Sequence, residues 1–470
     1  MPACRHPGDG RRRPERIRDA PVLRSAIIVH CASRDGCDRC AAWGRARVNQ
    51  GDEQATGAGG LTACRECDLL HRIAPLAPGG KALCTRCAAP LYRNVPDSLD
   101  RASALYLAAL MLWVMANAFP FVSLRLGGRV EDNVMLSGPL ALAREGMPEL
   151  GLLVFLTSIL FPLATIAGSL YVLLPLRFGW RFPGTAPAYR MVRLLNPWSL
   201  VGVFMLGLLV SIVKLMDLAD VVPGTGLYAF VGLLLATAAA NANMDHGAIW
   251  PRVGPLPAGQ GPAPAATAAA LGLTGCPTCE MLVPAAPPGG HARCPRCGSP
   301  VHGPRHPDSI ARTWALLASA ALMLVPANLY PVMTVIQFGQ GEPNTILGGV
   351  IHLIDSGMWP LAMLVFFASF VVPLSKIAVL VLLLVTVHKG SGWRLRDRAL
   401  LYRVTEVVGA WSMIDIFLVG ILVALVNLGA LATVRPGVGA IFFGAAVVLT
   451  MLAAMSFDPR LIWDRAGRPR

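Results

Sequence analysis

The chain has few charged residues and none of the common enzyme motifs. Only 14% of its 470 residues are Asp, Glu, Lys or Arg, whereas 54% are hydrophobic and the mean hydropathy is +0.56. There is no G-x-x-x-x-G-K-[ST] phosphate loop, no H-E-x-x-H and no G-x-S-x-G, so familiar ATPase and hydrolase mechanisms lack their residues. This much apolar surface exceeds what one or two soluble cores can bury. We therefore expect a membrane protein that is not an enzyme.

The positive charge does not indicate nucleic-acid binding. The formal net charge is +14, but the excess Arg lies near the N-terminus and between apolar segments. No basic stripe carries the interleaved aromatic residues that stack on bases. We expect no nucleic-acid partner and attribute the charge to membrane topology.

Residues 1–60 lack any long apolar run, and the run Ala26–Val29 is too short for the core of a signal peptide. We interpret this segment as a disordered, Arg-rich extension. It holds three closely spaced cysteines, Cys31, Cys37 and Cys40. A metal site there would need Cys4 or His30 as its fourth ligand, and an incorrectly assigned start codon would explain the segment equally well.

Eight apolar runs reach the roughly 20 residues that cross a bilayer. They cover about residues 102–124, 150–176, 197–216, 226–244, 313–338, 358–387, 405–434 and 436–457. Prolines inside four of them indicate kinks, because a proline frees a carbonyl in the helix. The fold class is therefore predicted to be an all-α polytopic membrane protein.

The two groups of four runs are copies of each other. PDSLDR, from Pro96, matches PDSIAR, from Pro307, and NAFP matches NLYP at the same offset of 211 residues. Farther on, FPLATIA matches VPLSKIA, and WSLVGVF matches WSMIDIF. An even number of spans in each unit makes the two repeats parallel. The predicted organisation is a first cysteine module at 61–95, a membrane repeat at 96–250, a linker at 251–272, a second module at 273–306 and a second repeat at 307–464.

Loop charges predict the orientation. Arg and Lys cluster in the loops 177–195 and 388–403 and in the C-terminal tail, whereas the loops 217–225 and 339–357 contain none. The positive-inside rule therefore places both termini and both cysteine modules in the cytoplasm.

Each cysteine module contains two C-x₂-C pairs. The pairs are separated by 16 residues in CRECDLLHRIAPLAPGGKALCTRC and by 14 in CPTCEMLVPAAPPGGHARCPRC. This spacing is typical of a zinc ribbon, in which four thiolates form a tetrahedron with no open position. The expected ligands of two structural zinc ions are Cys64, Cys67, Cys84, Cys87, Cys276, Cys279, Cys294 and Cys297.

Other interpretations of the cysteine modules remain open. Four thiolates also bind iron, and C-x-x-C also serves thiol redox exchange, although redox use needs one pair in a βαβ unit. His71 and His291 lie between the pairs, where we expect solvated loop side chains rather than ligands. Gly298 suits the turn that follows a metal knuckle.

Two ionisable residues interrupt the apolar runs of the second repeat. Lys376 lies in VVPLSKIAVL, and Asp415 lies in WSMIDIFLV, whereas the first repeat has Thr165 and Gly202 at the matching positions. Charges inside spans are costly and are often functional. A structural Lys–Asp pair, or a lysine that reaches one interface, is the simpler alternative.

The duplicated four-cysteine module, the PDS motif, NAFP and NLYP, VPLSKIA, WSMIDIF and the ending MLAAMSFDPRLIWD together resemble the paraquat-inducible protein A family. The resemblance covers residues 61–464. The resemblance implies a protein of the Gram-negative inner membrane that works with a periplasmic MCE-domain protein. It also implies that the protein passes phospholipids into or out of the tunnel that this partner forms, without an ATPase. At the level of single residues, the resemblance implies that the eight ribbon cysteines bind metal and that Lys376 and Asp415 are the polar positions inside the membrane.

The leading hypothesis is therefore a lipid-transport subunit of the inner membrane. A membrane thiol redox protein for stress defence is the runner-up, and metal content would separate the two. A passive anchor for a periplasmic partner is the third alternative, which lipid co-purification would separate from the first.

Overall fold

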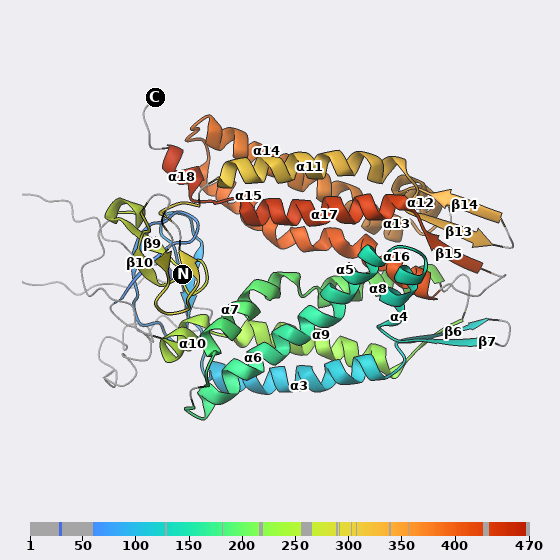
Figure 1. Cartoon of the computed structure of the whole chain (residues 1–470), viewed down its shortest axis with the longest axis horizontal. Coiled ribbons are helices and arrows are strands. Elements are labelled where there is room, and N and C mark those ends of the chain that lie inside the picture. The colour runs from blue at the N-terminus through green and yellow to red at the C-terminus, as the bar shows by residue number, and fades with distance from the viewer. Residues whose placement is uncertain are drawn as a thin grey trace, which may run out of the picture.

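The computed structural model describes residues 28–30, 60–126, 129–180, 182–215, 220–254, 266–287, 290, 292–301, 303–306, 308–337, 340–355, 357–425 and 432–466. Within these ranges, eight helices are long and apolar enough to cross a membrane. The helices lie side by side along the long axis of the molecule, with the cysteine modules at one end and small sheets at the other (Figure 1).

The first membrane repeat has four spans, two of which change helix type midway. Its elements are α3 (Ser98–Ala118), α5 (Pro148–Phe155), the π-helix η2 (Leu156–Leu160), α6 (Phe161–Arg177), α7 (Thr185–Leu195), the 3₁₀-helix η3 (Asn196–Trp198), α8 (Val201–Leu215), α9 (Thr225–Asn243) and the short α10 (His246–Val253). α5, η2 and α6 form one continuous span. Pro162 lies just after the π-helical turn, which accommodates the missing proline N–H.

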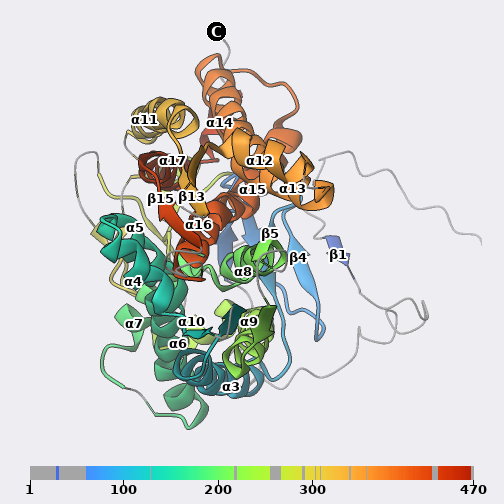
Figure 2. The same ribbon diagram turned by 90° about the vertical axis from the view of Figure 1, so that its right-hand side faces the viewer.

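The second repeat has the same order. Its elements are α11 (Ser309–Leu329), α12 (Ile346–Asp355), α13 (Trp359–Phe366), the π-helix η5 (Phe367–Val371), α14 (Val372–His388), α15 (Leu395–Gly409), the 3₁₀-helix η6 (Ala410–Met413), α16 (Ile414–Leu425), α17 (Val438–Ser456) and α18 (Leu461–Ala466). α12 corresponds to α4 (Ser137–Arg144) of the first repeat. The predicted pair of parallel four-helix repeats is confirmed. Figure 2 shows that the two helix groups lie beside one another.

Each repeat carries a three-stranded antiparallel sheet at the end of its helices that is far from the cysteine modules (Figure 1). The sequence did not predict these sheets. The strands are β6 (Val122–Leu126), β7 (Arg129–Asn133) and β8 (Asp220–Pro223) in one repeat, and β13 (Met333–Gln337), β14 (Gln340–Asn344) and β15 (Ala432–Pro436) in the other. The first strand is central in both sheets, and Met333 pairs with both Asn344 and Pro436.

The predicted spans 102–124, 313–338 and 405–434 are therefore wrong at their outer ends. α3 ends at Ala118 and α11 ends at Leu329, and the apolar residues that follow them form strands. A short apolar run with β-branched residues after a proline does not distinguish strand from helix by periodicity. The third span of each repeat also begins earlier than predicted, because the helices α7 and α15 extend it into the loops 177–195 and 388–403.

The repeated PDS motif joins the first and last helices of each repeat. The Ser98 hydroxyl donates to the carbonyl of Asn243 at 2.8 Å and accepts from the backbone N–H of Asp245 at 2.8 Å. In the second repeat the Ser309 hydroxyl makes the same two contacts with Ser456 and Asp458. These bonds satisfy backbone groups at a helix end, where the helix itself offers no partner. The repeated sequence therefore encodes a repeated closure of the bundle.

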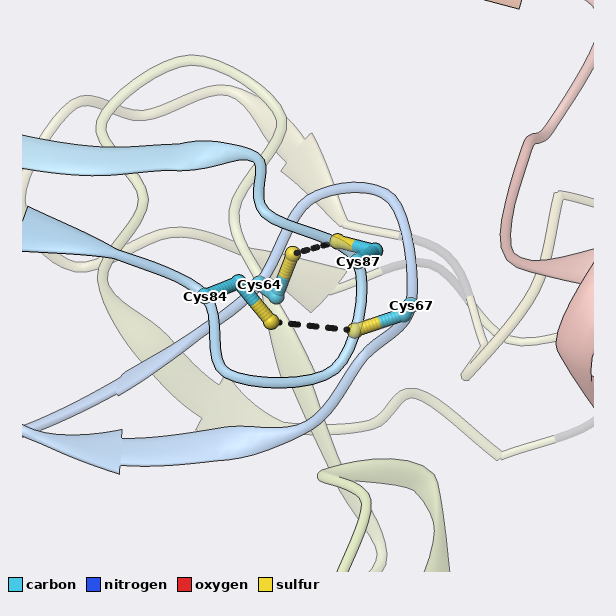
Figure 3. A group of neighbouring side chains, drawn as sticks. All are labelled: Cys64, Cys67, Cys84 and Cys87. Carbon is cyan, nitrogen blue, oxygen red and sulfur yellow. Dashed lines mark hydrogen bonds between the residues drawn. The ribbon is translucent and has the colours of Figure 1, made fainter. Parts of the chain in front are cut away.

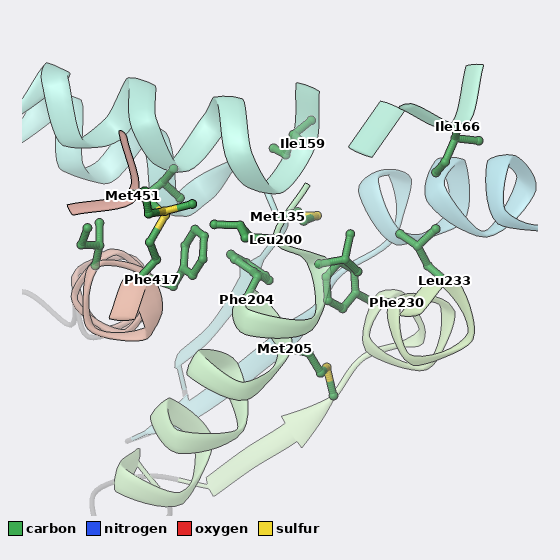
Figure 4. Packing of buried hydrophobic residues seen from close by; sticks show 14 of the residues in the cluster. Met135, Ile159, Ile166, Leu200, Phe204, Met205, Phe230, Leu233, Phe417 and Met451 are labelled. Carbon is green, nitrogen blue, oxygen red and sulfur yellow. The ribbon is translucent and has the colours of Figure 1, made fainter. Parts of the chain in front are cut away.

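The two repeats meet where α8 crosses α16. Phe204 of α8 packs edge-on against Phe417 of α16, with ring centroids 5.4 Å apart, and against Phe230 of α9 at 5.5 Å (Figure 4). Phe204 and Phe417 end the matching segments WSLVGVF and WSMIDIF, so equivalent residues of the two copies touch. A Cβ on Gly207 would lie 3.2 Å from the Cβ of Phe417. Close helix crossing in a membrane depends on such small residues.

The cysteine modules are built from short hairpins. The first has β2 (Leu61–Ala63), β3 (Leu70–Arg72), β4 (Lys81–Leu83) and β5 (Pro90–Arg93), and the second has β9 (Leu273–Gly275), β10 (Leu282–Pro284), β11 (Ala292–Arg293) and β12 (Pro300–Val301), preceded by the 3₁₀-helix η4 (Ala269–Leu271). Within the expected N-terminal extension, residues Ile28–His30 form β1, which pairs antiparallel with β4. Cys31, Cys37 and Cys40 lie outside the described residues.

Candidate functional site: two cysteine clusters and a buried lysine

The eight predicted ligands form two clusters of four thiols. In the first module the Sγ atoms of Cys64 and Cys87 are 3.4 Å apart, as are those of Cys67 and Cys84 (Figure 3). Cys276, Cys279, Cys294 and Cys297 repeat this arrangement, and in each cluster all four sulfurs lie within 4.8 Å of one another. A tetrahedral zinc ion with Zn–S distances of about 2.3 Å needs sulfurs about 3.8 Å apart. Both clusters therefore fit one metal ion each.

Four identical turns hold the sulfurs. In each C-x₂-C pair the first cysteine accepts a backbone hydrogen bond from the residue after the second cysteine, as Cys64 does from Asp68 at 2.9 Å. That residue has positive φ in every turn, namely 61° at Asp68, 58° at Ala88, 61° at Glu280 and 70° at Gly298. Only glycine adopts this conformation without strain, so the interpretation of Gly298 as a turn residue is confirmed and the other three are strained.

The expectation that His71 is a solvated loop residue is wrong. His71 is only 4% exposed, and its Nε2 lies 3.3 Å from the Sγ of Cys84. A ring N–H directed at a ligand sulfur offsets part of its negative charge, as outer-shell groups do in metal sites. His291 lies outside the described residues.

Crowding perturbs the thiols in opposite directions. Hydrogen bonds with Cys64 lower the pKa of Cys84 and raise the pKa of Cys67. Hydrogen bonds with Cys276 do the same for Cys297 and Cys279. Four thiolates in one buried cluster repel each other, so full ionisation needs a cation among them. The clusters are therefore suited to hold a metal ion.

The first module docks on the second membrane repeat. Arg403 of α15 donates to the carbonyl of Cys87 at 2.7 Å and pairs with Glu66 at 2.6 Å. Arg86 lies 4.6 Å from the ring centroid of Trp463 in α18. The ribbon cysteines share one buried cluster with side chains of this repeat, Tyr402, Phe457, Ile462 and Trp463.

The second module docks on the first repeat in the same way. Arg193 of α7 lies 3.8 Å from Glu280, and the buried cysteines pack with Tyr189, Met244, Ile249 and Trp250. These four residues match Tyr402, Phe457, Ile462 and Trp463 of the other repeat at an offset of 213. Each metal cluster therefore contacts the membrane helices of the opposite repeat through equivalent positions. The modules cross over, and the contacts link the two halves of the chain.

Buried charges hold the crossed modules together. Asp68, which is 1% exposed, accepts from Arg305 at 3.0 Å and from the backbone N–H of Ala269 at 3.0 Å. Arg305 also donates to Asp464 of α18 at 2.7 Å. Arg65 and Glu280 connect the two modules directly at 2.7 Å. Removing the partner of a buried charge is strongly destabilising, so the contacts of Asp68 fix the arrangement, whereas the more exposed Arg65–Glu280 pair contributes less.

His246 lies beneath the second module. Burial, and then the nearby charge of Arg193, lowers its pKa to about 3. The ring is therefore neutral at pH 7 and shares a hydrogen bond with the hydroxyl of Tyr189 through Nδ1. Tyr189 of this pair packs in the same buried cluster as the cysteines of the second module.

Lys376 is buried inside the second repeat, so it does not reach an interface. It is 1% exposed, and its ammonium donates to the hydroxyl of Thr450 at 3.0 Å and to the carbonyl of Gly409 at 3.3 Å. The carbonyl of Gly409 is the last one before α15 changes to the 3₁₀-helix η6. Such a break in a spanning helix exposes backbone oxygens to a buried cation.

Asp415 lies in the first turn of α16, and its side chain is outside the described part of the structure. Sequence reasoning missed Gly409 and Thr450 as neighbours of Lys376. Thr450 has a detectable signal, because the first repeat also has threonine, Thr237, at the matching position.

These features define a polytopic α-helical membrane protein made of two parallel repeats, each with a four-cysteine metal-binding module. Residues 99–254 and 310–467 both match the family described as Paraquat-inducible protein A. The chain belongs to this family. No solved structure matches it.

Curated relatives cover most of the chain. The Intermembrane transport protein PqiA of Escherichia coli strain K12 is 34% identical over 408 residues, which are 86% of this chain and 95% of that protein. The Lipophilic envelope-spanning tunnel protein A of the same strain is 31% identical over 407 residues, 86% of this chain and 92% of the relative. A Probable intermembrane transport protein of Haemophilus influenzae is 29% identical over 415 residues, with coverage of 87% and 97%.

Proposed function

We propose that this protein is an inner-membrane subunit of an intermembrane phospholipid transport system. It would pass lipid between the inner membrane and a tunnel formed by a periplasmic MCE-domain protein. The observation that carries the proposal is the match of both membrane repeats to one family whose curated members are named transport proteins. The absence of a nucleotide-binding motif in the sequence supports a role without catalysis.

Lys376 and Asp415 are proposed as the polar part of the transport path. A buried ammonium beside a helix break can hold a lipid phosphate or exchange a proton with a nearby acid. The apolar helices around it would accept the acyl chains. Purified protein should retain phospholipid, which a passive anchor would not.

The metal is proposed to be zinc, with a structural role. Four buried thiols per cluster leave no open coordination position for chemistry. The runner-up, thiol redox exchange, needs an accessible thiolate, whereas all eight clustered cysteines are buried.

We expect two zinc ions per chain in freshly purified protein. Because every described cysteine is buried and would be metal-bound, none should react with a thiol reagent until a chelator is added. Elemental analysis and timed thiol labelling measure both quantities. Well under one metal per chain, together with disulfides, would support the redox alternative.

Both termini and the modules are proposed to face the cytoplasm, and the sheets β7-β6-β8 and β14-β13-β15 the periplasm. The sheets include parts of the outward loops 125–149 and 339–357, where we expect the periplasmic partner to bind. The charge distribution supports this orientation, because basic residues gather on the module side.

Site-directed labelling tests the orientation. A Cys at Pro223, in β8, should react with an impermeant reagent added to intact spheroplasts. A Cys at Gly392, between α14 and α15, should react only after the cells are opened. The parent chain for both carries Ser at Cys4, Cys31, Cys37 and Cys40. The opposite labelling pattern would reverse the topology.

A further inference from the structure

The first repeat contains a polar cavity at the place where the second repeat holds Lys376. Its volume is about 210 Å³, and it lies among α3, α6, η3, α8 and α9. The polar residues that line it are Tyr106, Thr165, Asn196, Ser199, Thr237 and Asn241. Since one water takes about 30 Å³ of liquid volume, the space holds several waters or one small headgroup.

The cavity is the counterpart of the lysine site. Thr165, Asn196, Gly202 and Thr237 match Lys376, Gly409, Asp415 and Thr450 in the sequence alignment of the repeats. All four of these first-repeat residues line the cavity. The exchange of Lys for Thr and of Asp for Gly removes both charges and most of two side chains. The cavity is therefore lined by the residues that match Lys376 and its neighbours in the second repeat.

Three hydroxyls that line the cavity already donate their protons within the protein. Thr165 donates its proton to the carbonyl of Pro162 at 2.9 Å, and Thr237 donates to Leu233 at 2.7 Å. Tyr106 donates to the side-chain oxygen of Asn241 at 2.9 Å. Once a hydroxyl proton is used in this way, only lone pairs remain for a ligand.

The second repeat shows what such a threonine binds. Thr450 donates to the carbonyl of Val447 at 2.7 Å and accepts from the ammonium of Lys376 at 3.0 Å. Thr237 has the same position in its repeat and donates to its own helix in the same way. Its lone pairs therefore suit an ammonium group that comes from outside the chain.

The cavity is open on one side. Tyr106 and Thr165 are buried, whereas Asn196, Ala238 and Asn241 are exposed. A ligand can therefore insert a small cationic end between α9 and η3 while the rest of it stays outside. The residues that line the cavity include no Asp, Glu, Lys, Arg or His, so the site offers hydrogen-bonding groups without a formal charge.

We propose that this cavity binds a primary ammonium group, as carried by the ethanolamine headgroup of a phospholipid or by a soluble amine. An ammonium with three N–H donors satisfies the acceptors, whereas the trimethylated group of choline has no N–H to donate. Only the lipid source depends on the proposed function. Binding itself is measured without transport, so either idea can fail alone.

Native mass spectrometry of the full chain in detergent micelles tests the proposal. Phosphatidylethanolamine and phosphatidylcholine with identical acyl chains are offered in equal amounts. We expect at least about tenfold more ethanolamine lipid in the bound fraction, the order expected for hydrogen bonds to a charged group. Equal retention of the two lipids, without binding of ethanolamine itself, would overturn the proposal.

Variants locate the binding. Thr165→Val with Thr237→Val removes two acceptors at nearly constant volume and should abolish the preference. Thr165→Lys restores the side chain of the second repeat and should fill the site with the same result. Thr386→Val is the matched control, because Thr386 makes the same bonds to its own helix at 2.7 and 3.0 Å but lies in α14, outside the cavity. A preference that survives both test variants would refute the site.

Soluble amine separates the two sources. Suppose that ethanolamine raises the melting temperature of the parent chain but not that of Thr165→Lys, and that the two lipids are retained equally. The ligand is then a soluble amine. A larger shift with sodium chloride than with ethanolamine hydrochloride would replace the ammonium site with a metal-cation site and overturn the proposal. Zinc content and elution volume of each variant show that it is folded.

Discussion

Lys376→Ala should abolish lipid transport while the protein remains inserted and metal-loaded. The ammonium of Lys376 donates hydrogen bonds to the hydroxyl of Thr450 and to the carbonyl of Gly409. An isolated charge near the centre of a bilayer costs at least about 2.5–3.5 kcal/mol of insertion free energy. A charge kept at that cost is expected to act on the substrate. We expect at least about a tenfold loss in a lipid-transfer assay and no rescue of a null strain. Lys389→Ala, an exposed lysine just past the end of the same helix, should retain function.

Asp415→Ala should also abolish lipid transport if Lys376 and Asp415 act together. A structural pair predicts something different, because removing both charges of a buried pair is often harmless whereas removing one is not. Lys376→Met with Asp415→Leu therefore distinguishes the roles. Full activity in this double variant would reject the transport role and leave the pair as a packing element.

The sequence was sufficient to predict the cysteine clusters and the membrane spans, which depend on local residues. The spacing of Cys64 and Cys67 relative to Cys84 and Cys87 predicted a four-thiol cluster, because a knuckle is a local turn whose geometry follows from a few residues. The apolar runs predicted the spans because length and hydropathy decide insertion. Lys376 interrupts one of these runs, and the structure buries its side chain.

Features that depend on distant contacts were missed. β13 pairs with β15 across about a hundred residues, and both strands read as the ends of apolar helices. The burial of His71 depends on how two hairpins fold over the metal site. The crossed docking of the cysteine clusters could not be predicted from either repeat alone, since each cluster precedes its own repeat in the chain and packs against the other.

Loss of one metal cluster should loosen the opposite membrane repeat. Cys84→Ser removes a ligand of the first module, whose knuckle lies against Arg403 and Trp463 of the second repeat. Structural zinc contributes on the order of 10 kcal/mol to the folding of a small module, so this module should unfold and release its contacts.

We expect amide hydrogen exchange in α15 and α18 to rise by about tenfold or more in Cys84→Ser, while α7 and α10 stay protected. Cys294→Ser is the matched variant in the second module, which lies on Tyr189 and Trp250, and it should show the reverse pattern. Each variant should keep one bound metal instead of two. Exchange that rises in the repeat following the damaged module would contradict the crossed arrangement. Exchange that rises in the opposite repeat would mean that the two metal clusters hold the halves of the chain together. Loss of the first metal would then loosen the repeat that contains Lys376, and loss of the second would loosen the repeat that contains the polar cavity.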